Sequence, residues 1–151
     1  MPDSPHPRVV QVKAFTVSVI VAAFLMVGCS RTPVEDGLFF PTWSAEGAVP
    51  SGILQGTLVK DDRCLYVQRN GQRTLVAWED GMGFEDGTLL GTSGFPTARV
   101  GRIIHGGGGY YGNDQGHIEE LSRESIPARC VPRPGGERFA IIYDVKAGLF
   151  E

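Results

Sequence analysis

Five residues that commonly bind metal ions or transfer protons lie close together in the second half of the chain. They are His105, Asp114, His117, Glu119 and Glu120, all within sixteen positions, and they would suit zinc binding or general acid–base hydrolysis. Their spacing matches neither a His-Glu-x-x-His motif nor an EF-hand calcium loop. Such residues more often form a solvated surface, so the sequence predicts no metal and no cofactor. An envelope hydrolase or metal-dependent enzyme using His105 or His117 with nearby carboxylates is the alternative hypothesis.

A run of four glycines follows His105 and precedes Tyr110 and Tyr111. It superficially resembles the His-Gly-Gly-Gly segment of lipases and esterases, whose main-chain amides stabilise an oxyanion. That chemistry also needs a Gly-x-Ser-x-Gly turn, and the nearest string, Gly91-Thr92-Ser93-Gly94, has the wrong spacing. We therefore interpret the run as a flexible turn or irregular strand, in which missing side chains let the backbone approach its neighbours closely. The sequence assigns no catalytic residue.

Aromatic side chains offer a ligand groove as a second kind of site. The candidate ligand-binding residues are Trp78, Tyr110 and Tyr111, together with His105, and Tyr66 is a further aromatic of this kind. Small barrels also need aromatic residues in their cores, so burial is the competing interpretation.

The elements that position these residues read as short strands between frequent turns. Asn70-Gly71, between residues 64–68 and 74–78, predicts a hairpin because both central residues of a type I′ turn need positive φ. Further strands are expected at 53–59, 88–90, 98–104 and 138–145, with an acidic turn at 79–87 and a helix at 117–122 opened by Asn113 or Asp114. The expected fold is all-β: a small five- to six-stranded barrel (OB-like) or sandwich with one short helix.

Composition excludes several other classes of protein. The chain of 151 residues has a formal net charge of −3, so no overall basic field indicates a nucleic-acid partner. Its 21 glycines and 10 prolines are too many for a helical bundle and follow no collagen-like period.

The N-terminal segment has the features of a secretory signal peptide. Fifteen uncharged residues at 14–28 follow the basic residues Arg8 and Lys13. As a helix they would rise only about 22 Å, less than the hydrocarbon core of about 30 Å, so a permanent transmembrane helix is disfavoured.

The apolar run ends in Leu25-Met26-Val27-Gly28-Cys29-Ser30. This string resembles the lipobox of bacterial lipoproteins, in which an aliphatic residue, a small or β-branched residue and Gly or Ala precede a cysteine. Met26 departs from the usual Leu. The resemblance implies that the chain is cleaved before Cys29 and that this cysteine becomes an acylated N-terminus, for example with palmitate. The acyl groups would anchor the protein to the outer face of a membrane in the cell envelope. An ordinary cleaved signal and an uncleaved anchor are the alternatives.

Lipidation of Cys29 would leave Cys64 and Cys130 as an even pair in an exported, oxidising setting. We expect them to form a disulfide. Two free thiols or half of a metal site are the alternatives, and zinc is disfavoured because the chain has no Cys-x-x-Cys motif.

The expected organisation has three parts: a signal peptide helix at 1–28, a lipidated N-terminus and tether at 29–51, and a β-domain at 52–151. Residues 38–40 and Trp43 are too apolar for a purely solvated tether, so they are expected to pack on the domain or at the lipid interface. The leading hypothesis is a non-enzymatic, lipid-anchored envelope protein that binds or scaffolds something. Its expected partners are the membrane and either an envelope protein or a small molecule.

Overall fold

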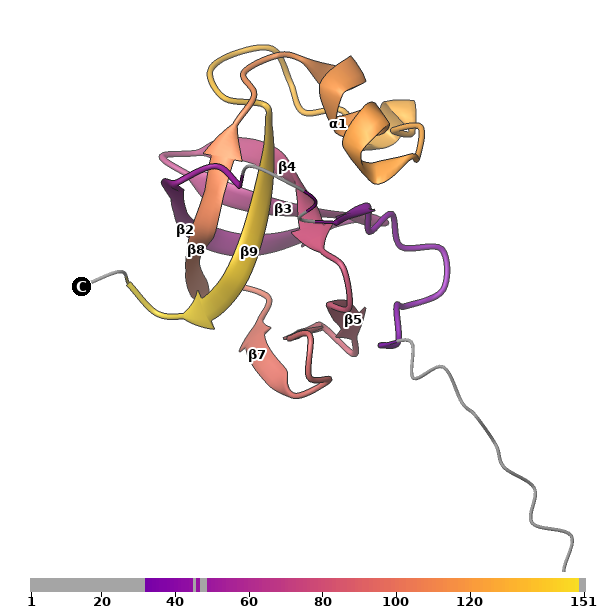
Figure 1. The fold of residues 1–151 in the computed structure, drawn as a ribbon, viewed down its shortest axis with the longest axis vertical. Coiled ribbons are helices and arrows are strands. Elements are labelled where there is room, and N and C mark those ends of the chain that lie inside the picture. Colours follow the sequence, from indigo (N-terminus) through magenta and orange to yellow (C-terminus); the bar gives the residue numbers. More distant parts are fainter. Residues whose placement is uncertain (1–31, 45, 47–48, 150–151) are drawn as a thin grey trace, which may run out of the picture.

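The computed structural model describes residues 32–44, 46 and 49–149. The expected signal peptide helix and Cys29 lie outside these residues. The described chain is built mainly of strands, and its one α-helix lies at the end opposite the small sheet of β5–β7 (Figure 1).

Two sheets contain the strands of the described residues. The larger holds β1 (Thr42–Trp43), β2 (Gly52–Asp61), β3 (Cys64–Arg69), β4 (Gln72–Glu79), β8 (Ile103–Tyr110) and β9 (Phe139–Ala147). The smaller holds β5 (Gly83–Glu85), β6 (Thr88–Leu90) and β7 (Pro96–Arg99). Helix α1 (Gln115–Ser122) and the 3-10 helix η1 (Ala128–Cys130) lie between β8 and β9.

The larger sheet curls into a partly open barrel. Its strand order is β1-β4-β3-β2-β8-β9, and β9 also pairs in parallel with β4, from Leu75 opposite Phe139 to Trp78 opposite Ile142. The five barrel strands thus neighbour one another in the order first, second, third, fifth, fourth, as in an OB-like Greek-key barrel. The predicted all-β, OB-like class with one short helix is confirmed. Here the helix precedes the last barrel strand, rather than lying between the third and fourth.

The predicted β3–β4 hairpin is present with its expected turn. Arg69 pairs with Gln72, and Asn70 and Gly71 between them have φ of 50° and 75°. Both central residues therefore adopt the left-handed conformation that a tight hairpin requires.

The prediction of a single strand at 98–104 is wrong, because the region contains parts of two strands. Gly101, with φ of 85°, lies in a turn that separates β7 from β8. The turn sends β7 into the small sheet and β8 into the barrel. The region expected to be an acidic turn, 79–87, likewise contains β5.

The four glycines lie in β8, where it passes between β2 and β9. A Cβ atom at Gly107 would overlap the ring of Tyr143, and one at Gly108 would overlap the main-chain oxygen of Ile141. The register between β8 and β9 also shifts between His105 and Gly107. The run is therefore an irregular strand that permits close backbone approach, not a flexible turn.

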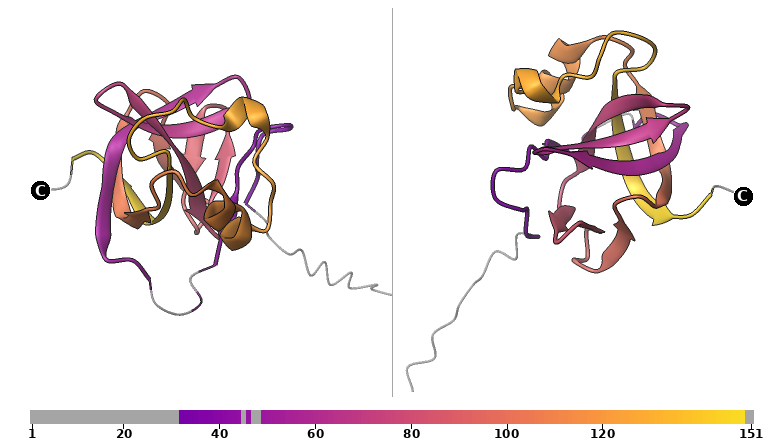
Figure 2. Two further views of the ribbon diagram at one scale, coloured as in Figure 1. Left: turned by 90° about the horizontal axis from the view of Figure 1, so that it is seen from above. Right: turned by 180° about the vertical axis from the view of Figure 1, so that it is seen from behind.

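Two apolar clusters hold the fold together. One fills the barrel, with Leu54, Trp78, Phe84 and Ile104 fully buried. The other covers the outside of β3, β4 and β9, where Ile118 of α1 packs with Phe139 and the two cysteines. Burial of this second cluster fixes α1 and the connection that follows it against the barrel (Figure 2).

Residues 32–43, assigned by sequence to the tether, pack against the barrel instead. Phe40 and Trp43 are buried, Phe40 stacks on Trp78 with ring centroids 5.5 Å apart, and β1 pairs with β4. Of the two packing partners expected for these apolar residues, the domain and the lipid interface, the structure shows the domain. Residues 32–43 therefore belong to the folded domain rather than to a free tether, because packing removes the rings of Phe40 and Trp43 from water.

Candidate functional site

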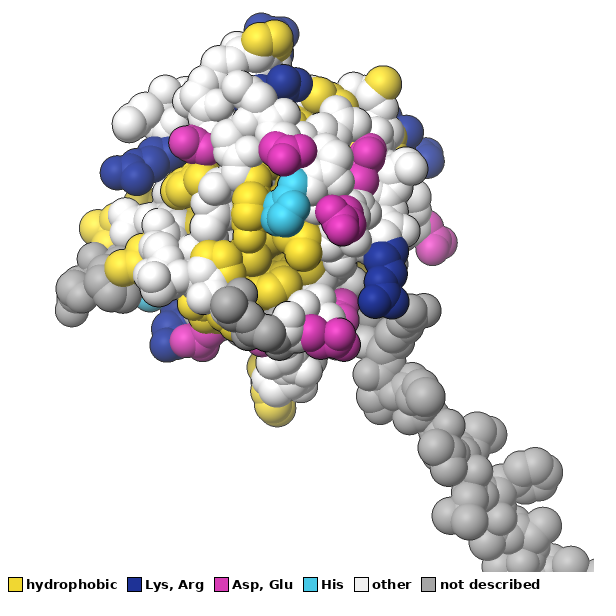
Figure 3. All heavy atoms as spheres, turned by 45° about the horizontal axis from the view of Figure 1, so that its top comes forward, with side chains coloured by type: hydrophobic (Ala, Val, Ile, Leu, Met, Phe, Trp, Pro, Cys, Tyr) yellow, Lys and Arg dark blue, Asp and Glu magenta, His cyan; other side chains and the backbone are white. Residues whose placement is uncertain are grey.

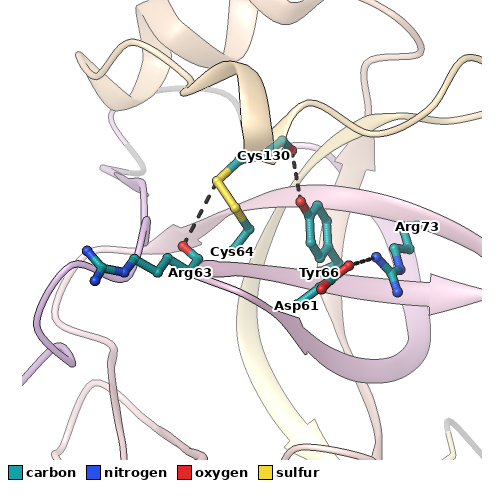
Figure 4. The surroundings of a disulfide bond; sticks show 6 residues. All are labelled: Asp61, Arg63, Cys64, Tyr66, Arg73 and Cys130. Atoms are coloured by element: carbon teal, nitrogen blue, oxygen red, sulfur yellow. Dashed lines mark hydrogen bonds and ion pairs between the residues drawn. A yellow bond between two sulfur atoms is a disulfide. The ribbon is translucent and has the colours of Figure 1, made fainter.

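The second apolar cluster is fastened by a disulfide between Cys64 and Cys130. Their Cα atoms are 5.5 Å apart, and the bond joins positions separated by 66 residues (Figure 4). The pairing expected from the sequence is therefore present in the structure. It fixes η1, and with it the start of the following loop, to the first residue of β3.

Tyr66, two residues after Cys64 in β3, connects the same two elements a second time. Its side chain is buried, and its hydroxyl donates a hydrogen bond to the main-chain oxygen of Cys130 at 3.2 Å. The Arg73 guanidinium lies over the ring, 5.6 Å from its centroid. Burial raises the pKa of Tyr66, while the nearby charges of Arg73 and Arg129 oppose that rise. Tyr66 is consequently a neutral phenol held beside two cationic groups.

Two side-chain hydrogen bonds tie the loop after η1 to the barrel, and Arg138 braces the loop internally. The Gln72 side-chain amide donates to the main-chain oxygen of Gly135. The Thr74 hydroxyl donates to that of Glu137 at 2.7 Å. Arg138 donates twice to Pro132, at 3.1 and 2.8 Å. These contacts hold residues 131–138 at a set position above the β3–β4 hairpin.

A groove of about 860 Å³ lies between the hairpin and this loop. Its charged lining residues are Asp61, Arg73, Arg129 and Arg133. Asp61 forms an ion pair with Arg73. Arg129 and Arg133 are exposed and belong to no ion pair within the described residues. The groove therefore has a net positive charge in a chain whose formal net charge is −3, and arginine is the side chain best suited to carboxylate or phosphate groups.

A smaller hollow of about 270 Å³ adjoins the groove and shares Asn70 and Gln72 with it. Tyr110, one of the candidate ligand-binding residues, lines this hollow with its side chain 37% exposed. Tyr110 therefore lies beside the groove and not in its lining.

The other candidate ligand-binding residues lie elsewhere. Trp78 is fully buried and stacks on Phe40, so its assignment to a ligand site is corrected to a core position. Tyr111 is half-buried and packs on the His117 ring, with centroids 4.4 Å apart. His105 lies near the start of β8, where its Nδ1 is 3.0 Å from the main-chain oxygen of Gly148.

The two histidines of the enzyme hypothesis are not brought together. Five residues of extended chain lie between His105 and Tyr111, a span of about 20 Å, and His117 packs against Tyr111. Acidic side chains surround a histidine at the α1 end of the molecule (Figure 3), but two of the acidic groups there serve the fold. Asp114 caps α1, and Glu119 accepts hydrogen bonds from Gln115 and Ile126, which lower its pKa. Across residues 32–44, 46 and 49–149, no three His, Cys, Asp or Glu side chains are grouped to hold a metal ion.

Sequence reasoning missed the arginines of the groove. Arg129 and Arg133 flank Cys130 in a Pro-rich stretch that carries no strand or helix signal. The available signal was the disulfide itself, because a bond from Cys64 to Cys130 necessarily brings the neighbours of Cys130 to the hairpin.

No family model, curated protein or solved structure matches this chain. Among the described residues, no helix has both the length and the apolar character needed to span a bilayer.

Proposed function

We propose that this protein is a lipid-anchored, non-enzymatic protein of the cell envelope whose β-barrel binds a ligand bearing carboxylate or phosphate groups. The observation that carries the proposal is the groove beside the disulfide, which holds the unpaired charges of Arg129 and Arg133 at its edge. The ligand is either a small molecule or an acidic glycan of the envelope.

The construction of the groove supports a binding role. Its loop is held by a disulfide and four hydrogen bonds, so little conformational freedom is lost when a ligand is bound. The lining also offers the amide groups of Gln68 and Gln72 as neutral donors and acceptors. In OB-like barrels the second and third strands, with the loop between the fourth and fifth, form the usual ligand face. Here those elements are β3, β4 and the connection that carries Arg129.

The anchor is proposed from the lipobox-like string that ends at Cys29. A single acyl chain holds a protein to a bilayer only marginally, whereas two or three give stable attachment. The protein would thereby face the outer side of a membrane without crossing it.

Binding is tested with two pairs of substitutions that each remove two positive charges. R129A/R133A alters the groove, and R99A/R102A alters exposed arginines around the turn between β7 and β8. The probes are glucuronate oligomers for carboxylates, inositol hexakisphosphate for phosphates, and dextran oligomers as a neutral reference, with Kd measured calorimetrically.

We expect one anionic probe to bind the wild-type protein, with affinity falling as salt is raised. R129A/R133A should weaken that binding at least tenfold, while R99A/R102A changes it less than twofold. Equal losses in the two variants, or no binding of either anionic probe, would contradict the ligand proposal.

The anchor is tested separately by C29A in a bacterial host fed labelled palmitate. The wild-type protein should carry the label and fractionate with membranes, and C29A should remain unlabelled. An unlabelled wild-type protein would exclude lipidation whatever the groove binds.

A further inference from the structure

We propose that the turn carrying Phe95 is a membrane-contact surface, which lies on the lipid interface and directs the groove away from it. The inference rests on the proposed lipid anchor at Cys29 and adds an orientation that the anchor alone does not give.

The start of the described chain and the Phe95 turn are neighbours in the structure. The Thr32 hydroxyl donates a hydrogen bond to the main-chain oxygen of Gly81. A Cβ atom at Gly81 would lie 3.7 Å from the side chain of Thr92. Thr92 in turn belongs to the tight turn closed by the hydrogen bond from Gly91 N to the oxygen of Phe95. This end of the molecule therefore presents both the incoming chain and Phe95.

The chemistry of the turn suits a lipid interface. Thr92, Ser93, Gly94, Phe95 and Pro96 are five consecutive exposed residues without a charge. Phe95 is 73% exposed, the largest fraction among the large apolar side chains of the described residues. An uncharged turn loses little hydration on approaching a bilayer, and a phenylalanine ring gains by entering the boundary between headgroups and acyl chains.

Covalent geometry keeps the proposed anchor at Cys29 close to the end of the barrel that carries the Phe95 turn. Three peptide units join Cys29 to Thr32, and they span at most about 11 Å even when fully extended. Thr32 is itself fixed to the domain: Phe84 N donates to the Pro33 oxygen at 2.9 Å, and Val34 pairs with Phe84 of β5. An acylated Cys29 thus holds this end of the barrel near the lipid, leaving no long tether for free rotation.

The same orientation leaves the proposed binding groove accessible. Figure 1 and the right-hand view of Figure 2 place β5 and β7 at the end where the described chain begins, and α1 with the following loop at the opposite end. A ligand could then reach Arg129 and Arg133 from the aqueous side.

The test measures depth at two positions in the full-length, acylated protein bound to phosphatidylethanolamine–phosphatidylglycerol vesicles. S93C places a thiol in the turn without removing Phe95, and N113C places one in the exposed segment before α1. Each is labelled with the polarity-sensitive dye NBD, and quenching by nitroxide lipids is compared with quenching by aqueous iodide. The S93C probe is also measured with F95S, and co-sedimentation of every sample reports the anchor.

We expect nitroxide lipids to quench the S93C probe at least threefold more than the N113C probe, and F95S to abolish most of that difference while the protein stays bound. Equal iodide access at both positions in sedimenting protein would overturn the contact surface but leave the anchor standing. Protein that fails to sediment at all would overturn both.

Discussion

The phenol of Tyr66 donates a hydrogen bond to the main-chain oxygen of Cys130, 3.2 Å away, two residues along the strand from the disulfide partner Cys64. One covalent bond and one hydrogen bond therefore join β3 to η1 side by side. The pair acts as a clamp, since together they restrict both the position and the rotation of the segment that carries Arg129. The floor of the proposed groove depends on this clamp.

Y66F removes the hydroxyl and leaves the Cys130 oxygen without that donor. We expect the free energy of unfolding to fall by about 1 kcal/mol, the usual net value of such a hydrogen bond. Y110F is the matched control, because the Tyr110 hydroxyl forms no hydrogen bond with another described residue and its side chain is partly exposed. Urea denaturation of both variants gives the comparison, and equal losses would contradict a specific role for Tyr66.

Alkaline pH should act on the same group. Burial raises the pKa of Tyr66 in the folded state above its ordinary value near 10. The unfolded state therefore releases the proton first, and stability that is complete below about pH 10 should decline as pH rises through the folded-state pKa. Y66F should lack this component. Stability measured at pH 8 and at increasing alkaline pH, with tyrosinate absorbance followed in parallel, tests the effect; identical slopes for the two proteins would contradict it.

Removing the disulfide should have the largest effect on stability. A loop of 66 residues corresponds to roughly 4 kcal/mol of unfolded-state chain entropy. We expect C64A/C130A to lose most of that amount in urea denaturation. Hydrogen exchange in residues 131–136 should rise as well, because the loop keeps only its hydrogen bonds to the barrel. A loss below about 1 kcal/mol would show that chain constraint is not what the bond contributes.

The glycine run supports a prediction about packing. In G108A the added methyl group would overlap the main-chain oxygen of Ile141, which cannot move without disturbing β9. We expect a loss of at least about 2 kcal/mol in the free energy of unfolding. G116A is the control, since its methyl group would sit 3.7 Å from Asp114 in a helix where alanine is favoured. It should be neutral or stabilising by up to about 1 kcal/mol, and a G108A protein as stable as G116A would refute the close approach.

Local signals and long-range contacts differ in how far the sequence reveals them. The Asn70-Gly71 hairpin depends on neighbouring residues and was predictable. The helix start was predictable to within one residue, Asn113 or Asp114, and the structure has Asp114. The separation of β7 from β8 was not, because residues 98–104 look uniformly strand-like and only the competing sheets reveal the turn at Gly101. The groove was hidden for a similar reason. Arg129 lines a groove only because the Cys130 disulfide places it opposite the β3–β4 hairpin.

The start of α1 gives a final test of how local chemistry supports the site. The Asp114 carboxylate accepts a hydrogen bond from His117 N at 3.0 Å, capping a helix whose Ile118 is buried in the cluster beside the disulfide. D114A should cost about 1 kcal/mol and raise hydrogen exchange in α1, whereas D114N should cost less because asparagine also caps well. A small residual loss in D114N would measure the attraction between the carboxylate and the helix dipole. Equal losses in D114A and D114N would mean that charge, rather than the capping hydrogen bond, holds this helix against the barrel.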